Sequence, residues 1–426
     1  MAKLSNQPPK GTNDWLPAEL KIRQYIFNTW RQVCQSCGYQ EYLTPIIEAA
    51  EIYQAKSGED VGGKELMMFQ DKAGRNLAIR PEMTPSITRL VSRIYNAEQK
   101  PIRYFSIANF LRNEKPQRGR NREFWQLNFD IFGSQAKGAD LEIMQMALDI
   151  MLAFQPPAQS FFLAINSREL IEGLLTTAKI KPDKQQAIVR LLDKWGKLPI
   201  KDWQSALKDL NIATEPQNKI MAFMSAKTIK DLTKALPELK NNQGLKDIQD
   251  AIDSLSQLGY GQWLQFKPSV IRGFDYYDGL IFEVFDNHRD NNRSMFGGGR
   301  YNGLAQIFGG QSFPAVGCAP GDETTKLFLA SWKLLDKIQK SKEEEVYYLP
   351  LLDQTLLLPT QKLAKKLRQV GRQVECGLTE QRINKALDYA NKKQIPWVVI
   401  LGSDESQKGK YKVKNMKTGQ EKTIKL

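Results

Sequence analysis

The sequence predicts an α+β protein: a strand-rich domain interrupted by a helical insertion and followed by a small α/β domain. Two long apolar and aromatic strands, Arg103–Asn113 and Arg122–Phe132, flank a basic loop. Between about Arg168 and Leu258 helical patterns follow one another with no convincing strand among them. From Val346 onward strands and helices alternate, which is typical of a sheet with parallel strands.

The first 154 residues mix helices and strands. Ala18–Cys37 is expected to be an amphipathic helix, because apolar residues recur there at spacings of three and four and Gly38 follows. Tyr39–Glu48 is expected to be a short strand in which Pro45 prevents full backbone pairing. The other expected elements are a hairpin of Met67–Asp71 and Asn76–Arg80, a helix over Thr84–Asn96 and an apolar, buried helix over Ala139–Phe154.

The later elements define the predicted domain boundaries. The insertion is expected to hold helices over Arg168–Ala178, Pro182–Lys194, Lys201–Leu210, Asn218–Met224, Ile229–Leu236 and Leu245–Leu258. Strands return from Trp263, and a glycine-rich segment and a helix over about Glu323–Ile338 follow. The last domain alternates strand Val346–Leu352, helix Thr360–Val370, strand Arg372–Cys376, helix Thr379–Gln394 and strand Trp397–Gly402. We therefore expect parts at 1–167, 168–262, 263–339 and 346–426, with a charged linker at 340–345.

Composition narrows the classes of function. No run of 18 apolar residues is present and the N-terminus has no apolar signal region, so we expect a cytoplasmic protein that does not enter a membrane. Four cysteines in 426 residues do not make a disulfide framework. The only histidine, His288, lies among Asn and Asp and is expected to be an exposed loop residue. Chemistry based on a histidine triad or a histidine-rich metal site is therefore not expected.

The net charge of +14 has two readings. It predicts a polyanionic partner, nucleic acid before membrane, or it reflects a general lysine bias of the source. Residues 341–426 hold 17 basic and 10 acidic residues, so half of the excess lies in the last fifth of the chain.

Three short motifs are better explained by structure than by function. Cys34 and Cys37 have redox spacing, but they lie on the first expected helix and have no second pair for zinc. Residues 133–138 have the glycine spacing of a P-loop without its lysine. Residues 297–303 lack the spacing of a dinucleotide-binding loop.

The segment Leu111–Gln126, L-R-N-E-K-P-Q-R-G-R-N-R-E-F-W-Q, is the strongest candidate site. Alternation places Arg112 and Glu114 on one face of the first strand, and Phe124 and Gln126 on one face of the second. Arginines above an aromatic ring suit a nucleotide, and the basic loop between the strands could hold a nucleic-acid backbone. A solvated hairpin with surface charges is the alternative.

This segment resembles motif 2 of the class II aminoacyl-tRNA synthetases, in its histidyl form. R-G-F-D-Y-Y (272–277) and F-G-G-G-R-Y-N-G-L (296–304) are similar to the two histidyl signatures, and R-P-E-M-T (80–84) to the amino-acid-binding strand end. P-K-G-T-N-D-W-L-P (9–17) looks like the opening segment, the helix that leads to Pro45 like motif 1, and the last domain like the anticodon-binding domain. The resemblance runs over nearly the whole chain and implies a catalytic domain built on an antiparallel sheet.

The resemblance also implies a reaction and its residues. Histidine would be activated by ATP, with Mg²⁺ on the phosphates, and transferred to the 3′ end of tRNA-His by a homodimer. Arg112 and Arg272 would be catalytic, on the reacting phosphate and carboxylate. The implied histidine-binding set is Glu82, Met83, Thr84, Arg112, Gln126, Asp130, Arg272, Tyr276 and Tyr277. The implied ATP-binding set is Arg112, Glu114, Arg120 and Phe124; Gln117 and Arg118 would contact tRNA, and no protein ligand of a metal is identified.

Three residues depart from the family pattern. Asp130 stands where glutamate is usual, which would lengthen its contact with the imidazole, and Trp125 stands where many members have histidine. Thr324 stands where motif 3 has an arginine for the γ-phosphate; its hydroxyl or that of Thr325 could instead cap the following helix, and Arg118 or Arg120 could supply the charge. The alternative to a working ligase is therefore an impaired, synthetase-like regulator that senses histidine or tRNA.

Overall fold

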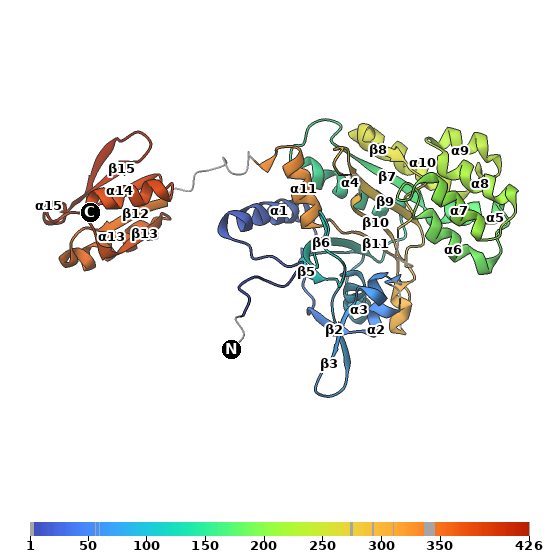
Figure 1. Cartoon of the computed structure of the whole chain (residues 1–426), viewed down its shortest axis with the longest axis horizontal. Coiled ribbons are helices and arrows are strands. Elements are labelled where there is room, and N and C mark those ends of the chain that lie inside the picture. The colour runs from blue at the N-terminus through green and yellow to red at the C-terminus, as the bar shows by residue number, and fades with distance from the viewer. Residues whose placement is uncertain are drawn as a thin grey trace. The chain divides into compact units, whose positions relative to one another are not determined.

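The computed structural model describes residues 4–55, 57–58, 60–272, 276–291, 294–309, 311–335 and 346–425. The chain forms two compact units, Met1–Leu335 and Asp336–Leu426, which are described separately (Figure 1). The linker expected at 340–345 and the end of the helix expected to reach Ile338 lie outside the described residues. No helix in the described ranges is long and apolar enough to cross a bilayer.

An eight-stranded sheet forms the centre of the first unit. Its strands lie in the order β1 (Gln40–Glu41), β5 (Ile102–Leu111), β6 (Glu123–Phe132), β11 (Ala315–Cys318), β10 (Ser294–Arg300), β9 (Leu280–Asp286), β7 (Phe161–Ser167) and β8 (Leu264–Phe266). Only the two outermost pairs, β1–β5 and β7–β8, are parallel. The α+β class with a sheet that is mainly antiparallel is therefore confirmed.

The two long predicted strands form the hairpin β5–β6. Their register runs from Ile102 opposite Phe132 to Leu111 opposite Glu123 without a shift. The glycine-rich segment was not assigned to a strand from the sequence, yet it contributes β10. Glycine is required here because a Cβ on Gly298 would lie 2.1 Å from the carbonyl oxygen of Gly317 on β11.

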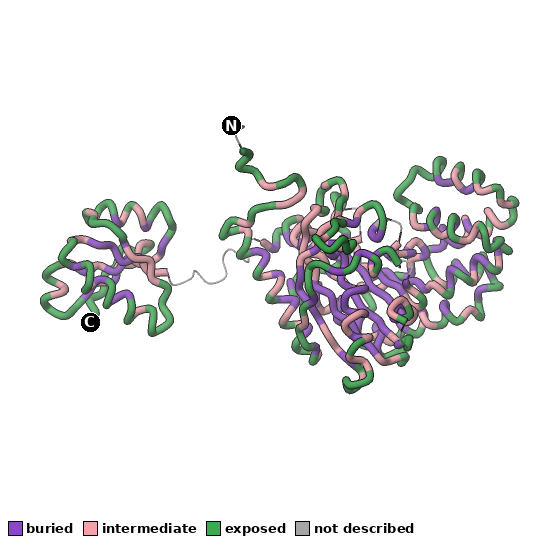
Figure 2. The backbone as a smooth tube through the Cα atoms, turned by 90° about the horizontal axis from the view of Figure 1, so that it is seen from below, coloured by how far each residue is buried: buried purple, intermediate pink, exposed green. Residues whose placement is uncertain are grey.

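Helices cover the sheet, whose strands are the most buried part of this unit (Figure 2). Helix α1 (Pro17–Ser36), predicted at 18–37, packs with α4 (Lys137–Leu152) and α11 (Asp322–Ser331). Its apolar residues Ile22, Ile26 and Trp30 are buried inside the protomer. The resemblance to motif 1 implies a dimer contact through this helix, but these three buried side chains are not available for one.

A three-stranded sheet, β2 (Ile47–Ala49), β4 (Asn76–Ile79) and β3 (Met67–Gln70), lies beside α2 (Glu51–Gln54) and α3 (Thr84–Ile94). The β3–β4 hairpin is confirmed. The single strand expected over Tyr39–Glu48 is wrong, because the chain leaves the large sheet after β1 and joins the small sheet as β2. Pro45 lies between them, where it has no backbone donor for either sheet.

The helices expected between Arg168 and Leu258 are present. They are α5 (Arg168–Thr177), α6 (Pro182–Leu192), α7 (Ile200–Asp209), α8 (Thr214–Ser225), α9 (Ile229–Ala235) and α10 (Gln243–Leu255). Strand β7 just before them was missed. Its central residues are buried, so it has no alternation of polar and apolar residues to reveal it.

The C-terminal unit is a five-stranded sheet in the order β13 (Gln373–Glu380), β12 (Val346–Leu351), β14 (Trp397–Ile400), β15 (Lys410–Asn415) and β16 (Glu421–Lys425). Along the chain, helix α13 (Leu357–Gln369) connects β12 to β13, α14 (Ile383–Lys392) connects β13 to β14, and α15 (Ser403–Gln407) connects β14 to β15. The parallel strands β13, β12 and β14 were predicted, but the antiparallel hairpin β15–β16 was not. All five residues of β16 are exposed, which leaves no buried face in its sequence pattern.

Candidate active site

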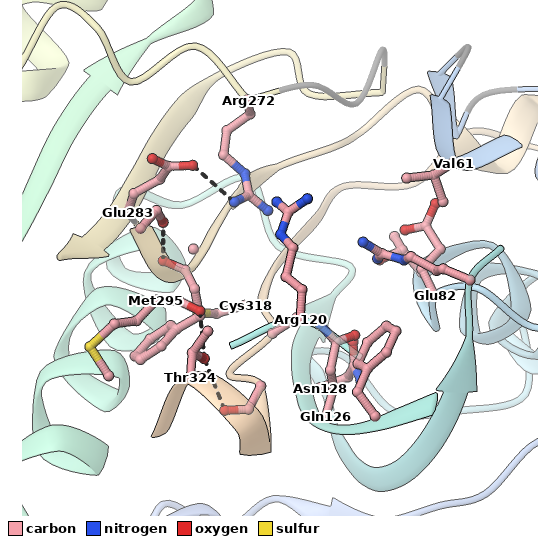
Figure 3. Close-up of a pocket in the computed structure, with 18 of the residues that line it drawn as sticks. Val61, Glu82, Arg120, Gln126, Asn128, Arg272, Glu283, Met295, Cys318 and Thr324 are labelled. Carbon is pink, nitrogen blue, oxygen red and sulfur yellow. Dashed lines mark hydrogen bonds and ion pairs between the residues drawn. The ribbon is translucent and has the colours of Figure 1, made fainter. Parts of the chain in front are cut away.

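A cavity of about 360 Å³ brings together residues from both ends of the first unit (Figure 3). Strand β6 contributes Phe124, Gln126, Asn128 and Asp130, which are two positions apart and therefore share one face. Asn128 was not predicted, although the same alternation marks it. Within the described chain its buried Nδ2 atom has no hydrogen-bond partner.

Arg112 lies just after β5 on one wall of this cavity. Its Nε donates a hydrogen bond to the Pro81 carbonyl at 3.0 Å, and its guanidinium lies 5.1 Å from the centre of the Phe124 ring. Burial lowers the pKa of Arg112, against the opposing effect of Glu82. The arginine stays protonated at neutral pH, because an arginine pKa starts far above that range.

Arg272 also lines the cavity. It donates from Nη1 to Glu283 at 3.2 Å and from Nη2 to the Tyr277 hydroxyl at 3.4 Å. Burial acts to lower the pKa of Arg272, but Tyr277 and Glu283 outweigh it and the pKa is raised. Its backbone φ of +63° is unusual for a residue with a side chain, and such geometry is kept where surrounding contacts hold it.

Glu82 and Tyr276 form a buried pair at the end of the cavity near α3. The Tyr276 hydroxyl donates to Glu82 Oε2 at 2.9 Å, and burial raises the pKa of Glu82. Thr84 also lines the cavity. Met83 does not, because its side chain packs in the apolar core; its place in the histidine-binding set stays a prediction.

Asp130 and Tyr301 form a second buried pair, with the Tyr301 hydroxyl donating to Asp130 Oδ1 at 2.6 Å. Burial raises the pKa of Asp130 to about 7. A Cβ on Gly317 would lie only 1.8 Å from Asp130 Oδ1, so glycine is required opposite this carboxyl. The resemblance put Asp130, Tyr276 and Tyr277 in one histidine-binding set, and it did not include Tyr301, although Tyr301 lies in the second signature.

The motif 2 loop, residues 115–122, contributes side chains to the lining of two cavities. Arg120 forms an ion pair with Glu114 at 3.2 Å, and both line the first cavity with Phe124, whose ring is stacked on Phe110 at 5.8 Å. Gln117 and Arg118 line a neighbouring cavity instead. The loop is therefore not a hairpin surrounded only by solvent.

Thr324 lies in the first turn of α11, against the motif 2 loop. Its hydroxyl lies 2.9 Å from the Met295 carbonyl and 3.1 Å from that of Gly321, and the Thr325 hydroxyl lies 2.7 Å from the Gly321 carbonyl. Both hydroxyls therefore act as donors to carbonyl groups, and the expected helix cap through either threonine is wrong. Buried Arg23 of α1 binds the neighbouring Glu323 at 2.6 Å.

Cys34, Cys37 and His288 have surroundings that are typical of structural residues. Cys34 and Cys37 are free thiols, and burial raises the pKa of both. His288 lies in a loop as predicted, but it is half-buried against the Trp332 ring rather than exposed. No three His, Cys, Asp or Glu side chains gather as a metal-binding group in the ranges that the structure describes.

Comparisons with known proteins agree with this arrangement. Residues 11–321 match the family model of histidyl-tRNA synthetase, and residues 345–426 match an anticodon-binding domain. The chain is 37% identical to the histidine–tRNA ligase of Leptospira biflexa and 34% identical to that of Thermococcus kodakarensis; each alignment covers 97% of this chain and 94% or 95% of the relative. The fold matches the crystal structure of histidyl-tRNA synthetase from Nostoc sp. PCC 7120 with a TM-score of 0.78 at 21% identity, over 99% of this chain and 97% of that one. The chain belongs to the histidyl-tRNA synthetase family.

Proposed function

We propose that the protein is a histidine–tRNA ligase. A histidine carboxylate oxygen attacks the α-phosphorus of ATP, the bond to the β-phosphate oxygen breaks, and pyrophosphate leaves. A terminal hydroxyl of tRNA-His then attacks the carbonyl carbon, and AMP leaves. The observation that carries this proposal is the placing of two half-buried guanidiniums, Arg112 and Arg272, around one cavity that the buried carboxyls of Glu82 and Asp130 also line.

The first step needs positioning and charge stabilisation rather than a base, because the attacking carboxylate is already ionised. Arg112 and Arg272 would stabilise the charge on the reacting phosphate. Glu82, with Thr84 and Gln126, would hold the amino group and carboxylate of histidine. Asp130 and Tyr301 would bind the imidazole, where a carboxyl and a phenol can serve one donor and one acceptor nitrogen.

ATP would bind with its adenine on Phe124 and near Glu114, and with Arg120 near its outer phosphates. Mg²⁺ would bind together with ATP, because proteins usually hold this ion through one or two carboxylates and the phosphate oxygens of the substrate. Glu323 lines the cavity and is a suitable carboxylate. When bound, the ion would neutralise part of the negative charge of the phosphates.

Pyrophosphate exchange into ATP tests this proposal directly. Exchange that depends on histidine is expected from the ligase and not from a regulator that only senses histidine. The sequence relatives described above carry the ligase name, and they give the regulator no support. Absence of exchange with any amino acid would reject the ligase.

We propose that the C-terminal unit, 346–426, reads the anticodon, as its match to an anticodon-binding model supports. The catalytic domain would comprise 1–167 and 263–339, with 168–262 as its insertion and 340–345 as a linker. The proposed place of action is the cytoplasm, where tRNA is charged.

A homodimer is the expected assembly. The small sheet has one face made only of apolar side chains, none of which is buried in the protomer: Ile47, Ala49, Met67, Phe69, Leu77 and Ile79. A second copy would remove this face from water, which favours association. We expect a dimeric mass by light scattering at micromolar concentration.

Phe69→Lys should shift this mass toward the monomer, because Phe69 is 40% exposed in the protomer and would be covered in the dimer. Leu358→Lys changes an exposed leucine of the other unit and should leave the mass unchanged. A monomer in the wild type would contradict the proposal.

Thr324→Arg is expected to lower the KM for ATP. A Cβ on Gly119 would lie 4.0 Å from Thr324 Cγ2, so an arginine here would add charge beside Arg118 and Arg120, near the proposed γ-phosphate position. Thr324→Gln is the neutral control of similar length, and initial rates of exchange at varied ATP measure the effect. An unchanged KM would show that the existing cations suffice; exchange that appears only in Thr324→Arg would favour the impaired regulator.

A further inference from the structure

Lys267, which follows β8, makes no ion pair with a described acidic side chain, although the charge of Glu283 acts on it from a greater distance. Its Nζ lies 3.9 Å from the centre of the Phe285 ring and 5.3 Å from that of Phe162, and these two rings are stacked 5.2 Å apart. Among the residues that the structure describes, no carboxylate lies within 4.0 Å of this ammonium group. Burial lowers the pKa of Lys267. A partly desolvated cation of this kind would be stabilised by an anion that a ligand brings.

Lys267 lines a second cavity of about 1440 Å³. Its lining includes the motif 2 loop at Gln117–Arg120, the insertion loops 193–197 and 224–227, and the segment 265–269; β9, β10 and α11 contribute further residues. It adjoins the proposed active site, because Arg120, Glu283, Met295 and Thr324 line both cavities. Its volume exceeds that of an ordinary small-molecule pocket, which is about 300–1,000 Å³.

The acidic residues of this second cavity already have partners. Asp193 pairs with Lys197 at 2.7 Å, Glu283 binds Arg272 at 3.2 Å, and Asp286 accepts from Trp332 at 2.9 Å. Asp290 lies 3.7 Å from His288 and 4.0 Å from Arg289. In contrast, within the described ranges Arg118, Lys227 and Lys267 have no ion pair. Five basic and four acidic side chains line the cavity, so its positive excess is small, and the three cations without an ion pair among the described residues are the groups that favour an anionic ligand.

We propose that Lys267 binds a backbone phosphate of the RNA 3′ end, and that the Phe162–Phe285 pair holds the lysine in position. This inference rests on the proposed ligase function. The RNA end must reach the histidyl group in the first cavity, and the second cavity provides a route that continues into it. Phe285 lies two residues from Glu283 on β9, so both point to the same sheet face about 7 Å apart. The phosphate contact would therefore lie outside the reacting centre but close to it.

Lys267→Met tests the inference, because it keeps the packing against the rings and removes the charge. We expect kcat/KM for tRNA to fall about fivefold near 0.1 M salt, as the loss of one single-strand phosphate contact implies. The slope of log(kcat/KM) against log salt should become shallower by about 0.7. Histidine-dependent pyrophosphate exchange should be unchanged, and Lys267→Arg should restore charging of tRNA.

Lys208→Met is the matched control, since Lys208 is exposed on α7 and lines neither cavity. Equal tRNA kinetics and equal salt slopes in Lys267→Met and Lys208→Met would overturn the inference. A parallel loss of exchange, or a raised KM for ATP, would overturn it too, because Lys267 would then act on the first step or on folding. Absence of exchange in the wild type would reject the proposed function itself.

Discussion

Arg112→Ala and Arg272→Ala are each expected to reduce histidine-dependent pyrophosphate exchange by about 10²-fold or more. Each substitution removes a preorganised positive charge from the reacting phosphate in a site that excludes much of the solvent. The loss should appear mainly in kcat, because the charge on the phosphate group is redistributed as the new bond forms. Initial rates at saturating histidine and varied ATP measure it.

Lysine should not be able to replace Arg272. Arg272 makes two directed hydrogen bonds, to Glu283 and to Tyr277, so Arg272→Lys is expected to stay impaired. Arg93→Ala removes an exposed arginine of α3 that does not line the cavity and serves as the control. A thermal unfolding midpoint close to that of the wild type would separate lost catalysis from lost folding. Full activity in Arg112→Ala or Arg272→Ala would show that the ATP site is wrongly assigned.

Removal of residues 346–426 is expected to lower kcat/KM for tRNA by about 10²-fold while pyrophosphate exchange remains within a few-fold of the wild type. The chain divides into two compact units at 335/336, and every residue proposed for adenylate formation lies in the first unit. The second unit would add a separate contact with the same tRNA, and linked contacts multiply affinity by such factors.

Aminoacylation at varied tRNA concentration, with exchange measured on the same preparation, checks this expectation. The wild type should also lose affinity for tRNA more steeply with salt than the truncated protein, because residues 341–426 carry 17 basic and 10 acidic residues. Unchanged charging of tRNA by the truncated protein would contradict a role of this unit in anticodon reading. Loss of exchange would instead indicate that the first unit needs the second in order to fold.

Sequence patterns determined much of the architecture. Alternation along Arg122–Phe132 predicted the strand and placed Phe124 and Gln126 on one face, and both line the cavity. Helical periodicity predicted all six insertion helices. These features depend on the local repeat of strand and helix, so neighbouring residues are enough to reveal them. The pattern failed where burial hid the repeat, as in β7, or where exposure removed it, as in β16.

Only the tertiary structure decided which distant residues meet. Tyr301 pairs with Asp130 across 171 positions, and Arg23 meets Glu323 across 300, so no local pattern could join either pair. The same holds for Lys267, whose surroundings come from β7, β8 and β9. The sequence by itself determined the family, the sheet faces and most proposed site residues. Packing decided their partners and, through burial, the pKa of Asp130, because desolvation depends on every segment that closes over a group.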